Sequence, residues 1–111
     1  MRWAIAGIQE PDVVLVKTGP RESTLADLCA ELGDEPCYVV FDFEAVREDT
    51  STISKIVFVA YSPDTCTSMK KKFALQNFKA SVKAKINCHK EMQINDKADF
   101  SEREFRDAFG L

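Results

Sequence analysis

Residues 54–61 read SKIVFVAY and are followed at once by SPDT at residues 62–65. From Ile56 to Tyr61 every side chain is apolar or aromatic, which is typical of a strand buried on both of its faces. Pro63 and Asp64 then end the extended run, because proline has no backbone N–H to donate to a neighbouring strand. We therefore expect this strand at the centre of a sheet that helices cover on both sides, which is an α/β sandwich.

Further strand patterns lie upstream of this segment. Residues 37–43 (CYVVFDF) are predicted to form a hairpin with SKIVFVAY across the polar segment 44–52. Residues 3–8 and 13–16 are two shorter apolar runs, and the turn residues 9–11 between them predict a second hairpin.

Helical spacing appears in three places. After Gly19 and Pro20, a short helix capped by Ser23 or Thr24 carries apolar residues at helical spacing: Leu25, Leu28, Cys29 and Leu32. A long helix from Ser68 onward carries an apolar series spaced five, four and four: Phe73, Phe78, Val82 and Ile86. A short strand at residues 91–94 precedes the capping box Ser101–Glu104, which opens a last helix with Phe105 and Phe109 turned inward. The predicted order is ββαββαβα, in a single domain over residues 1–111.

Positive charge is concentrated in one part of the chain. The 111 residues carry a net charge of −3, yet residues 67–90 hold seven lysines and no acid, so the remainder totals −10. Lys79 and Lys83 are even a like-charged pair at i and i+4, which mildly destabilises a helix. This pattern predicts a surface that attracts an acidic partner, and the acidic remainder argues against nucleic acid.

Membrane insertion and secretion are not expected. The longest apolar run, residues 56–61, is far shorter than the roughly 20 residues that a spanning helix needs, and the N-terminus has no secretory signal pattern. We therefore expect a cytosolic protein without a transmembrane segment.

Little in the sequence indicates metal binding or catalysis. Four cysteines are widely separated, which favours reduced thiols: Cys29, Cys37, Cys66 and Cys88. Zinc held by Cys88 and His89 is the functional alternative, but adjacent side chains rarely chelate one metal, and no second pair at ligand spacing is present. His89 is the only histidine, and Asp42 and Glu44 have no partner base. We expect neither enzymatic activity nor a cofactor.

Taken in order, these segments resemble the ADF/cofilin family of actin-depolymerising factors. The resemblance rests on CYVVFDFE at residues 37–44, SKIVFVAYSPDT at 54–65, the lysine-rich helix after it and ADFSE at 98–102. An SPDT turn between an apolar strand and a basic helix is the most specific of these elements. Membership would imply an α+β sandwich with a central mixed five-stranded sheet flanked by helices. It would also imply a cytoplasmic, cytoskeletal protein that binds actin monomers and filaments and promotes filament turnover.

The resemblance also implies which residues contact actin. In the family, the helix after the SPD turn inserts between two actin subdomains, with basic residues before a methionine and an aromatic. If the loop is one residue longer here, Lys70 and Lys72 match the basic positions, Phe73 the methionine and Leu75 the aromatic. An ungapped match places Lys71 and Met69 at the basic positions instead. The predicted monomer-side contacts are therefore Met69, Lys70, Lys71, Lys72, Phe73 and Leu75.

Two departures from the family pattern predict weaker filament binding. The family begins with a helix, preceded by a flexible end with a phosphorylatable serine, whereas this chain starts at the first strand. We therefore expect the N-terminal actin contact and the phospho-switch to be missing. On the filament side only Lys55 matches, because Thr52 and Ile53 stand where the family commonly carries positive charge.

Two other functions remain open at this point. The ending DFSEREFRDAFG at residues 99–110 also resembles the glia maturation factor branch, which regulates actin branch junctions through actin-related proteins. Phosphoinositide binding through the same lysines is an alternative from a different class, since each lysine near an anionic membrane contributes on the order of 1 kcal/mol.

Overall fold

The first four strands form two antiparallel hairpins. The computed structural model describes residues 2–9, 12–46 and 49–110. Strands β1 (Trp3–Gln9) and β2 (Asp12–Gly19) make the first hairpin, and β3 (Cys37–Val46) and β4 (Thr52–Tyr61) make the second. Both hairpins were predicted; the turn residues Glu10 and Pro11 and the loop residues Arg47 and Glu48 lie outside the described residues.

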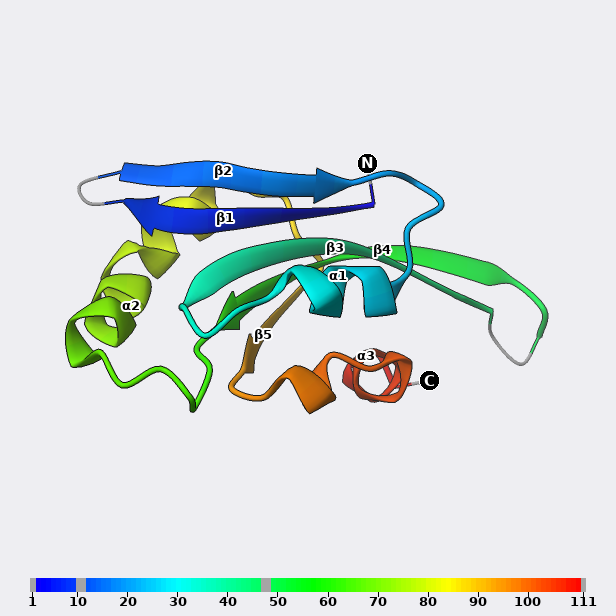
Figure 1. Cartoon of the computed structure of the whole chain (residues 1–111). Helices are drawn as coiled ribbons and strands as arrows, with labels where there is room; N and C mark the ends of the chain where they lie inside the picture. Colours follow the sequence, from blue (N-terminus) through cyan, green and yellow to red (C-terminus); the bar gives the residue numbers. More distant parts are fainter. Residues whose placement is uncertain (1, 10–11, 47–48, 111) are drawn as a thin grey trace.

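These strands and β5 (Lys90–Ile94) build one mixed sheet in the order β2-β1-β3-β4-β5 (Figure 1). Neighbouring strands are antiparallel except β4 and β5, which are parallel. The predicted mixed five-stranded sheet is confirmed. SKIVFVAY is an interior strand, paired on both sides, but β3 and not β4 holds the middle position of the sheet.

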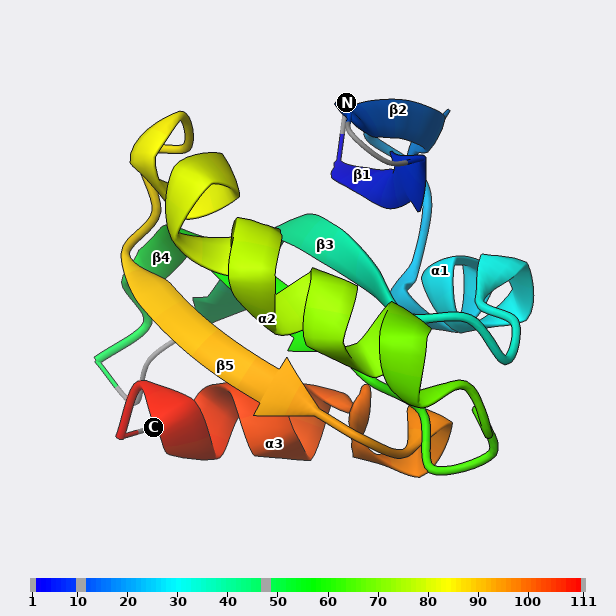
Figure 2. The ribbon, with the colours of Figure 1, turned by 90° about the vertical axis from the view of Figure 1, so that its left-hand side faces the viewer.

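Helices cover both faces of this sheet. Helices α1 (Leu25–Glu31) and α3 (Glu102–Ala108) lie on one face, and α2 (Met69–Ala84) crosses the other (Figure 2). A 3₁₀ turn at Lys97–Asp99 precedes α3. The predicted α/β sandwich and its order ββαββαβα are therefore confirmed.

Alternation along β3 divides the core between the two faces. Val39 and Phe41 point to the face of α1 and α3, where Phe41 stacks on Phe105 of α3 with ring centroids 5.6 Å apart. Tyr38 points to the α2 face and stacks on Phe58 of β4 at 5.6 Å. The α2 face thus has its own small aromatic core, which seats the helix.

The short helices begin as their sequences predict. Thr24, and not Ser23, is the N-cap of α1, and it forms a capping box with Asp27. Ser23 accepts a hydrogen bond from the indole Nε1–H of Trp3 at 2.9 Å instead. Ser101 caps α3 by accepting the backbone N–H of Glu104 at 3.2 Å.

Candidate functional site

The SPDT turn fixes where α2 begins. The N–H of Asp64 donates to the carbonyl of Asn95, just after β5, at 3.0 Å. The hydroxyl of Thr65 donates to the carboxylate of Asp34, in the loop between α1 and β3, at 2.8 Å. Ser68 then caps the helix by accepting the N–H of Lys71 at 3.3 Å. The turn is therefore anchored to two other parts of the fold, and it holds the start of α2 in a defined position.

The first residues of α2, 69–73 (MKKKF), form a largely exposed surface that we call the leading turn, in which Lys72 alone is half-buried. Met69 is 60% exposed and Phe73 is 63% exposed, which is unusual for large apolar side chains. Lys70 and Lys72 lie in the same turn, and neither makes an ion pair with any side chain that the structure describes. Apolar side chains flanked by cations match the apolar centre and polar rim of protein interfaces.

Leu75 does not belong to this exposed set, and its assignment as a contact residue is wrong. Its side chain is fully buried in the core of the α2 face, together with Tyr38 and Phe58. The hydroxyl of Tyr38 donates a hydrogen bond to the backbone carbonyl of Leu75. Leu75 therefore attaches the helix to the sheet and cannot touch a partner.

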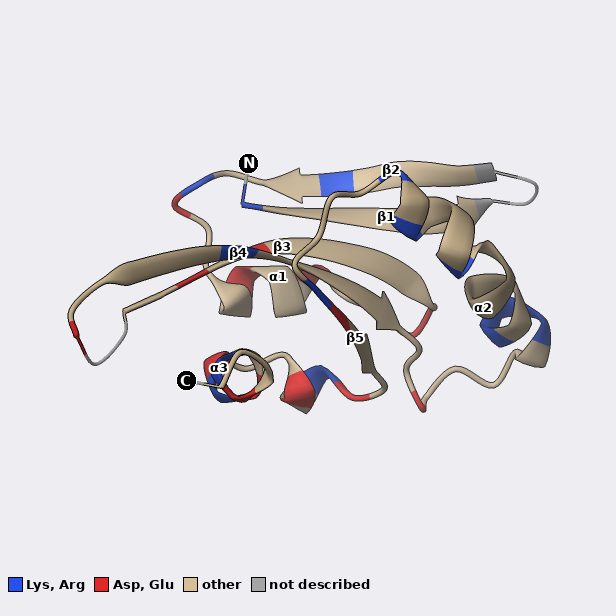
Figure 3. Ribbon diagram, turned by 180° about the vertical axis from the view of Figure 1, so that it is seen from behind, with Lys and Arg blue, Asp and Glu red and all other residues tan. Residues whose placement is uncertain are grey.

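Two acids from elsewhere in the fold pair with three of the seven lysines. The ammonium of Lys71 lies 2.5 Å from the carboxylate of Glu35, in the loop between α1 and β3. Glu91 of β5 pairs with both Lys79 at 2.8 Å and Lys83 at 2.5 Å. The expectation of an uncompensated basic segment is wrong for these three side chains, because acids outside that segment lie next to the lysines. Figure 3 shows the positions of positive and negative residues along the ribbon, with the basic residues of α2 in blue.

These pairs also change the ionisation of their members. Hydrogen bonds from Lys79 and Lys83 lower the pKa of Glu91 below its ordinary value. The hydrogen bond to Glu35 raises the pKa of Lys71, and that to Glu91 raises the pKa of Lys83. The paired carboxylates cancel much of the positive field of these lysines locally, and the leading turn keeps Lys70 and Lys72 as its available cations.

Lys55, the predicted filament-side residue, lies apart from the leading turn. It is half-buried on β4 and pairs in register with Phe43 of β3, on the face covered by α3. Six residues of extended chain, about 20 Å, separate it from Tyr61 at the end of that strand. The fold therefore brings Met69, Lys70, Lys71, Lys72 and Phe73 together and leaves Lys55 at a second location.

Other groups with chemical potential are spread over the molecule. All four cysteines are free thiols, and burial raises the pKa of Cys37 to about 12. The Nδ1 atom of His89 accepts a hydrogen bond from the backbone N–H of Ile56 in β4 at 2.9 Å. This nitrogen is therefore used in a structural contact with the sheet. Among the described residues, no group of three His, Cys, Asp or Glu side chains is placed to hold a metal ion. No described helix is long and apolar enough to cross a membrane.

Comparison with known proteins assigns the family. The family model for cofilin/tropomyosin-type actin-binding proteins matches residues 1–110 of this chain. The chain belongs to the ADF/cofilin family. Membership places this ADF/cofilin chain among actin-binding regulators and not among enzymes.

Curated relatives of this ADF/cofilin chain include plant actin-depolymerizing factors. Actin-depolymerizing factor 7 of Arabidopsis thaliana is 31% identical over 102 residues, which cover 90% of this chain and 74% of the relative. Actin-depolymerizing factor 2 of Oryza sativa is 32% identical over 99 residues, covering 86% and 68%. The match therefore leaves part of each relative uncovered.

Solved structures of ADF/cofilin-like proteins share its fold. Cofilin from Streptomyces griseoflavus superposes with a TM-score of 0.85 at 20% identity, covering 96% of this chain and 82% of that one. Human coactosin-like protein superposes with a TM-score of 0.80 at 17% identity, covering 96% and 79%. At such identities these similarities establish the fold alone.

Sequence reasoning missed two residues that shape the site of this ADF/cofilin chain. Glu35 and Glu91 each bind lysines of α2 but lie outside the basic segment, and Glu35 is 36 positions from its partner Lys71. No local pattern reveals such a contact. The sequence does hold a signal for the contacts of Glu91 with Lys79 and Lys83. Strand β5 follows α2 directly in sequence, so its first residues are expected near the end of that helix.

Proposed function

We propose that this ADF/cofilin chain binds the actin monomer, with the leading turn of α2 as its main contact. The observation that carries the proposal is the exposure of Met69 and Phe73 beside Lys70 and Lys72 at the start of a firmly anchored helix. We further propose that residues 1–111 form one ADF-homology domain that acts in the cytoplasm on the actin cytoskeleton.

The chemistry of the leading turn supports this assignment. Exposed aromatic and methionine side chains supply most of the binding energy when a partner buries them. Cations around them raise the association rate with an acidic surface more than they raise the final affinity. Because the SPDT turn holds the helix start in place, little conformational entropy is lost when the partner binds.

Filament binding is expected to be weaker than monomer binding. Lys55 is the single residue proposed for the filament side, and it is half-buried against the face of α3. A lone, partly covered cation adds little to an interface, since exposed ion pairs are typically worth at most about 1 kcal/mol. We therefore expect promotion of filament turnover, if measured, to require higher protein concentrations than monomer binding.

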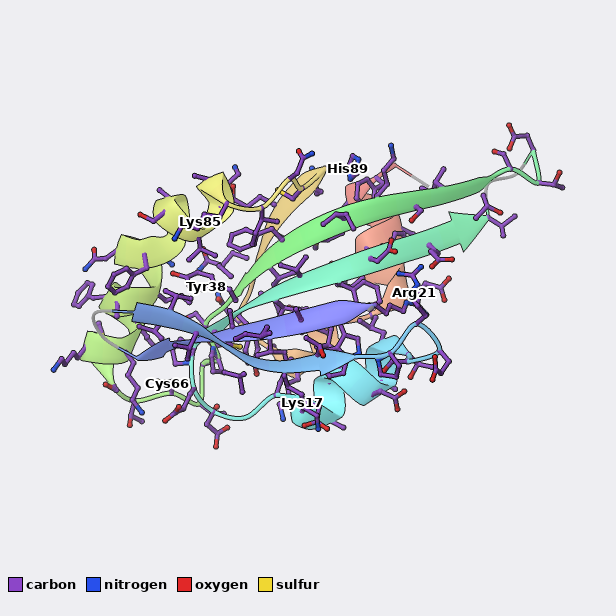
Figure 4. All side chains as sticks on the ribbon, turned by 90° about the horizontal axis from the view of Figure 1, so that it is seen from above. Lys17, Arg21, Tyr38, Cys66, Lys85 and His89 are labelled. Atoms are coloured by element: carbon purple, nitrogen blue, oxygen red, sulfur yellow. The ribbon has the colours of Figure 1, made fainter. Side chains whose placement is uncertain are left out.

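A charge-reversal series tests the proposed contact. Replacing Lys70 and Lys72 together by glutamate should lower the affinity for fluorescently labelled actin monomers by about tenfold or more, chiefly through a slower association rate. Lys85→Glu is the matched control: this exposed lysine lies at the opposite end of α2 (Figure 4). Equal affinity of the double variant and the control would count against the leading turn as the contact.

Binding measurements with other partners, set beside the actin titration, separate the two alternatives. A glia-maturation-factor-like protein would bind purified actin-related protein complex but not actin alone. A phosphoinositide-binding module would bind anionic vesicles in a strongly salt-dependent manner without actin affinity. The ion pairing of Lys71, Lys79 and Lys83 makes the second alternative less favourable, because only part of the lysine charge remains available to a membrane.

A further inference from the structure

A groove of about 560 Å³ lies beside the leading turn. Its lining includes apolar side chains from five different elements or their flanks: Ile5 of β1, Val16 of β2, Leu32 after α1, Cys37 of β3 and Ala74 of α2. Small-molecule sites in proteins typically measure about 300–1,000 Å³ and are mostly apolar with a few polar groups. This groove therefore has the size and lining of a ligand site.

Polar contacts hold the walls of the groove in place. The loop after α1 is fastened to the SPDT turn by the Thr65–Asp34 hydrogen bond at 2.8 Å. One residue further on, Glu35 pairs with Lys71 of α2 at 2.5 Å. The two contacts connect the same loop to the SPDT turn and to the start of α2, so the groove is already formed without a ligand. Little binding free energy is then needed to order its walls.

The charges at the rim leave a single available cation. Glu31 lines the groove but pairs with Lys17 of β2 at 2.6 Å, at the place where β2 passes α1 (Figure 4). Glu35 and Lys71 also line it and neutralise each other. Lys70 is the remaining charged side chain in the lining, and it has no ion pair among the described residues. A groove whose lining combines apolar side chains with one unpaired ammonium is complementary to a molecule with an apolar body and one negative charge.

We propose that this groove binds an amphipathic monoanion of the fatty-acid class. The alkyl chain contacts the apolar lining residues Val16, Leu32 and Ala74, and the carboxylate meets the ammonium of Lys70. Because Lys70 also belongs to the leading turn, a bound carboxylate competes with actin for that side chain. This regulatory consequence rests on the proposed function, whereas binding of the ligand does not.

A titration with three probes that share one alkyl chain tests the head-group requirement. Sodium decanoate, kept below micelle formation, should give saturable shifts in ¹⁵N–¹H spectra of the full chain, confined to residues around the groove. Decanol should bind about five- to tenfold more weakly, which is the loss expected for one charge-assisted contact at a partly exposed site. Decyltrimethylammonium should bind more weakly still. Equal affinity of all three probes would overturn the proposal.

Two variants and a control locate the site. Lys70→Gln should weaken decanoate binding about five- to tenfold and leave decanol binding unchanged, whereas Lys85→Gln should change neither. Val16→Trp places a bulky side chain on an exposed edge strand at the groove and should reduce the binding of both probes; thermal unfolding verifies that it stays folded. Identical decanoate affinity of Lys70→Gln and Lys85→Gln would contradict the assignment, as would shifts spread over the whole surface.

Actin binding is measured separately so that the two proposals fail in different ways. If decanoate binds at the groove and lowers actin affinity, both are supported. Absence of decanoate binding with intact actin binding overturns the groove alone, and saturable decanoate binding in a chain that does not bind actin overturns the proposed function alone. Binding only to vesicles that carry phosphoinositides, without monomeric decanoate, overturns the groove proposal.

Discussion

Replacing Leu75 by alanine should destabilise the protein without disturbing its binding surface. The side chain is fully buried in the core cluster that also contains Tyr38 and Phe58. Truncating a buried leucine typically costs about 2–5 kcal/mol, and we expect about 3 kcal/mol because aromatic rings enclose the site and limit its collapse. For a chain of this length, that loss lowers the melting temperature by roughly 10–15 °C.

Phe73→Ala is the matched comparison two positions earlier in the same helix. Its side chain is 63% exposed, so its removal should change the free energy of unfolding by no more than about 0.5 kcal/mol. Affinity for the actin monomer should nevertheless fall by about tenfold or more, as for an aromatic residue at the centre of an interface.

Thermal and urea unfolding followed by circular dichroism measure the two stabilities, and an actin titration at a temperature where both variants are folded measures the affinities. Leu75→Ala should keep its affinity under those conditions. The reasoning is refuted if Phe73→Ala lowers the melting temperature as much as Leu75→Ala does. It is also refuted if folded Leu75→Ala fails to bind while Phe73→Ala binds normally.

Three further predictions concern stability and reactivity. The pKa of Glu91 is lowered in the folded state, so its ion pairs stabilise the fold at pH values above 4.5, the ordinary pKa of glutamate. This contribution is lost as the pH falls through the lowered pKa. Glu91→Gln should therefore unfold in slightly less urea than the parent at pH 7, and the difference should vanish in acid. Gly19→Ala should destabilise the protein, because a Cβ atom there would lie 2.2 Å from the indole of Trp3; tryptophan fluorescence should shift to the red at lower temperature, and an unchanged transition would be inconsistent with this packing. Cys37, whose pKa burial raises to about 12, should react with a thiol reagent far more slowly than an exposed cysteine at pH 7, because little thiolate is present; labelling of native Cys37 as fast as that of a small-molecule thiol, mapped by mass spectrometry, would be inconsistent with the raised pKa.

Much of the fold could be predicted because burial leaves periodic marks on the sequence. The continuous apolar run 56–61 indicated an interior strand, and β4 is indeed paired on both sides and covered on both faces. Caps were equally local: Ser68 and Ser101 begin α2 and α3 as their side chains predict. What could not be predicted is that β3 holds the middle of the sheet, because pairing order depends on contacts between distant segments.

The error at Leu75 has a physical reason in the helical repeat. Leu75, Phe78 and Val82 are spaced three and four apart and form the stripe of α2 that packs on the sheet. Phe73 is five residues before Phe78, which turns it away from that stripe, and it is exposed. The buried stripe of α2 therefore begins at Leu75 and not at Phe73. Matching the family motif residue by residue assigned Leu75 to the contact residues although it belongs to that stripe.

The charges of the site depend on ion pairs that the lysine segment itself does not contain, and the pair with Glu35 is long-range in sequence. The lysine segment was correctly placed on a helix, but Glu35 and Glu91 arrive beside it only through the tertiary fold. The hydrogen bond from Tyr38 to the backbone of Leu75 is equally non-local. The ion pairs with Glu35 and Glu91 reduce the basic surface to fewer available cations than the sequence suggests.

Methyl NMR of the methionines tests the central claim most directly. In a chain with ¹³C-labelled methionine methyl groups, unlabelled actin monomer should broaden or shift the signal of Met69, which is 60% exposed in the leading turn. Met92 is half-buried on β5 and packs against the core on the sheet face covered by α1 and α3, so its signal should be the least affected. A Met69 signal unchanged at saturating actin, with Met92 perturbed instead, would mean that the partner binds elsewhere on the molecule.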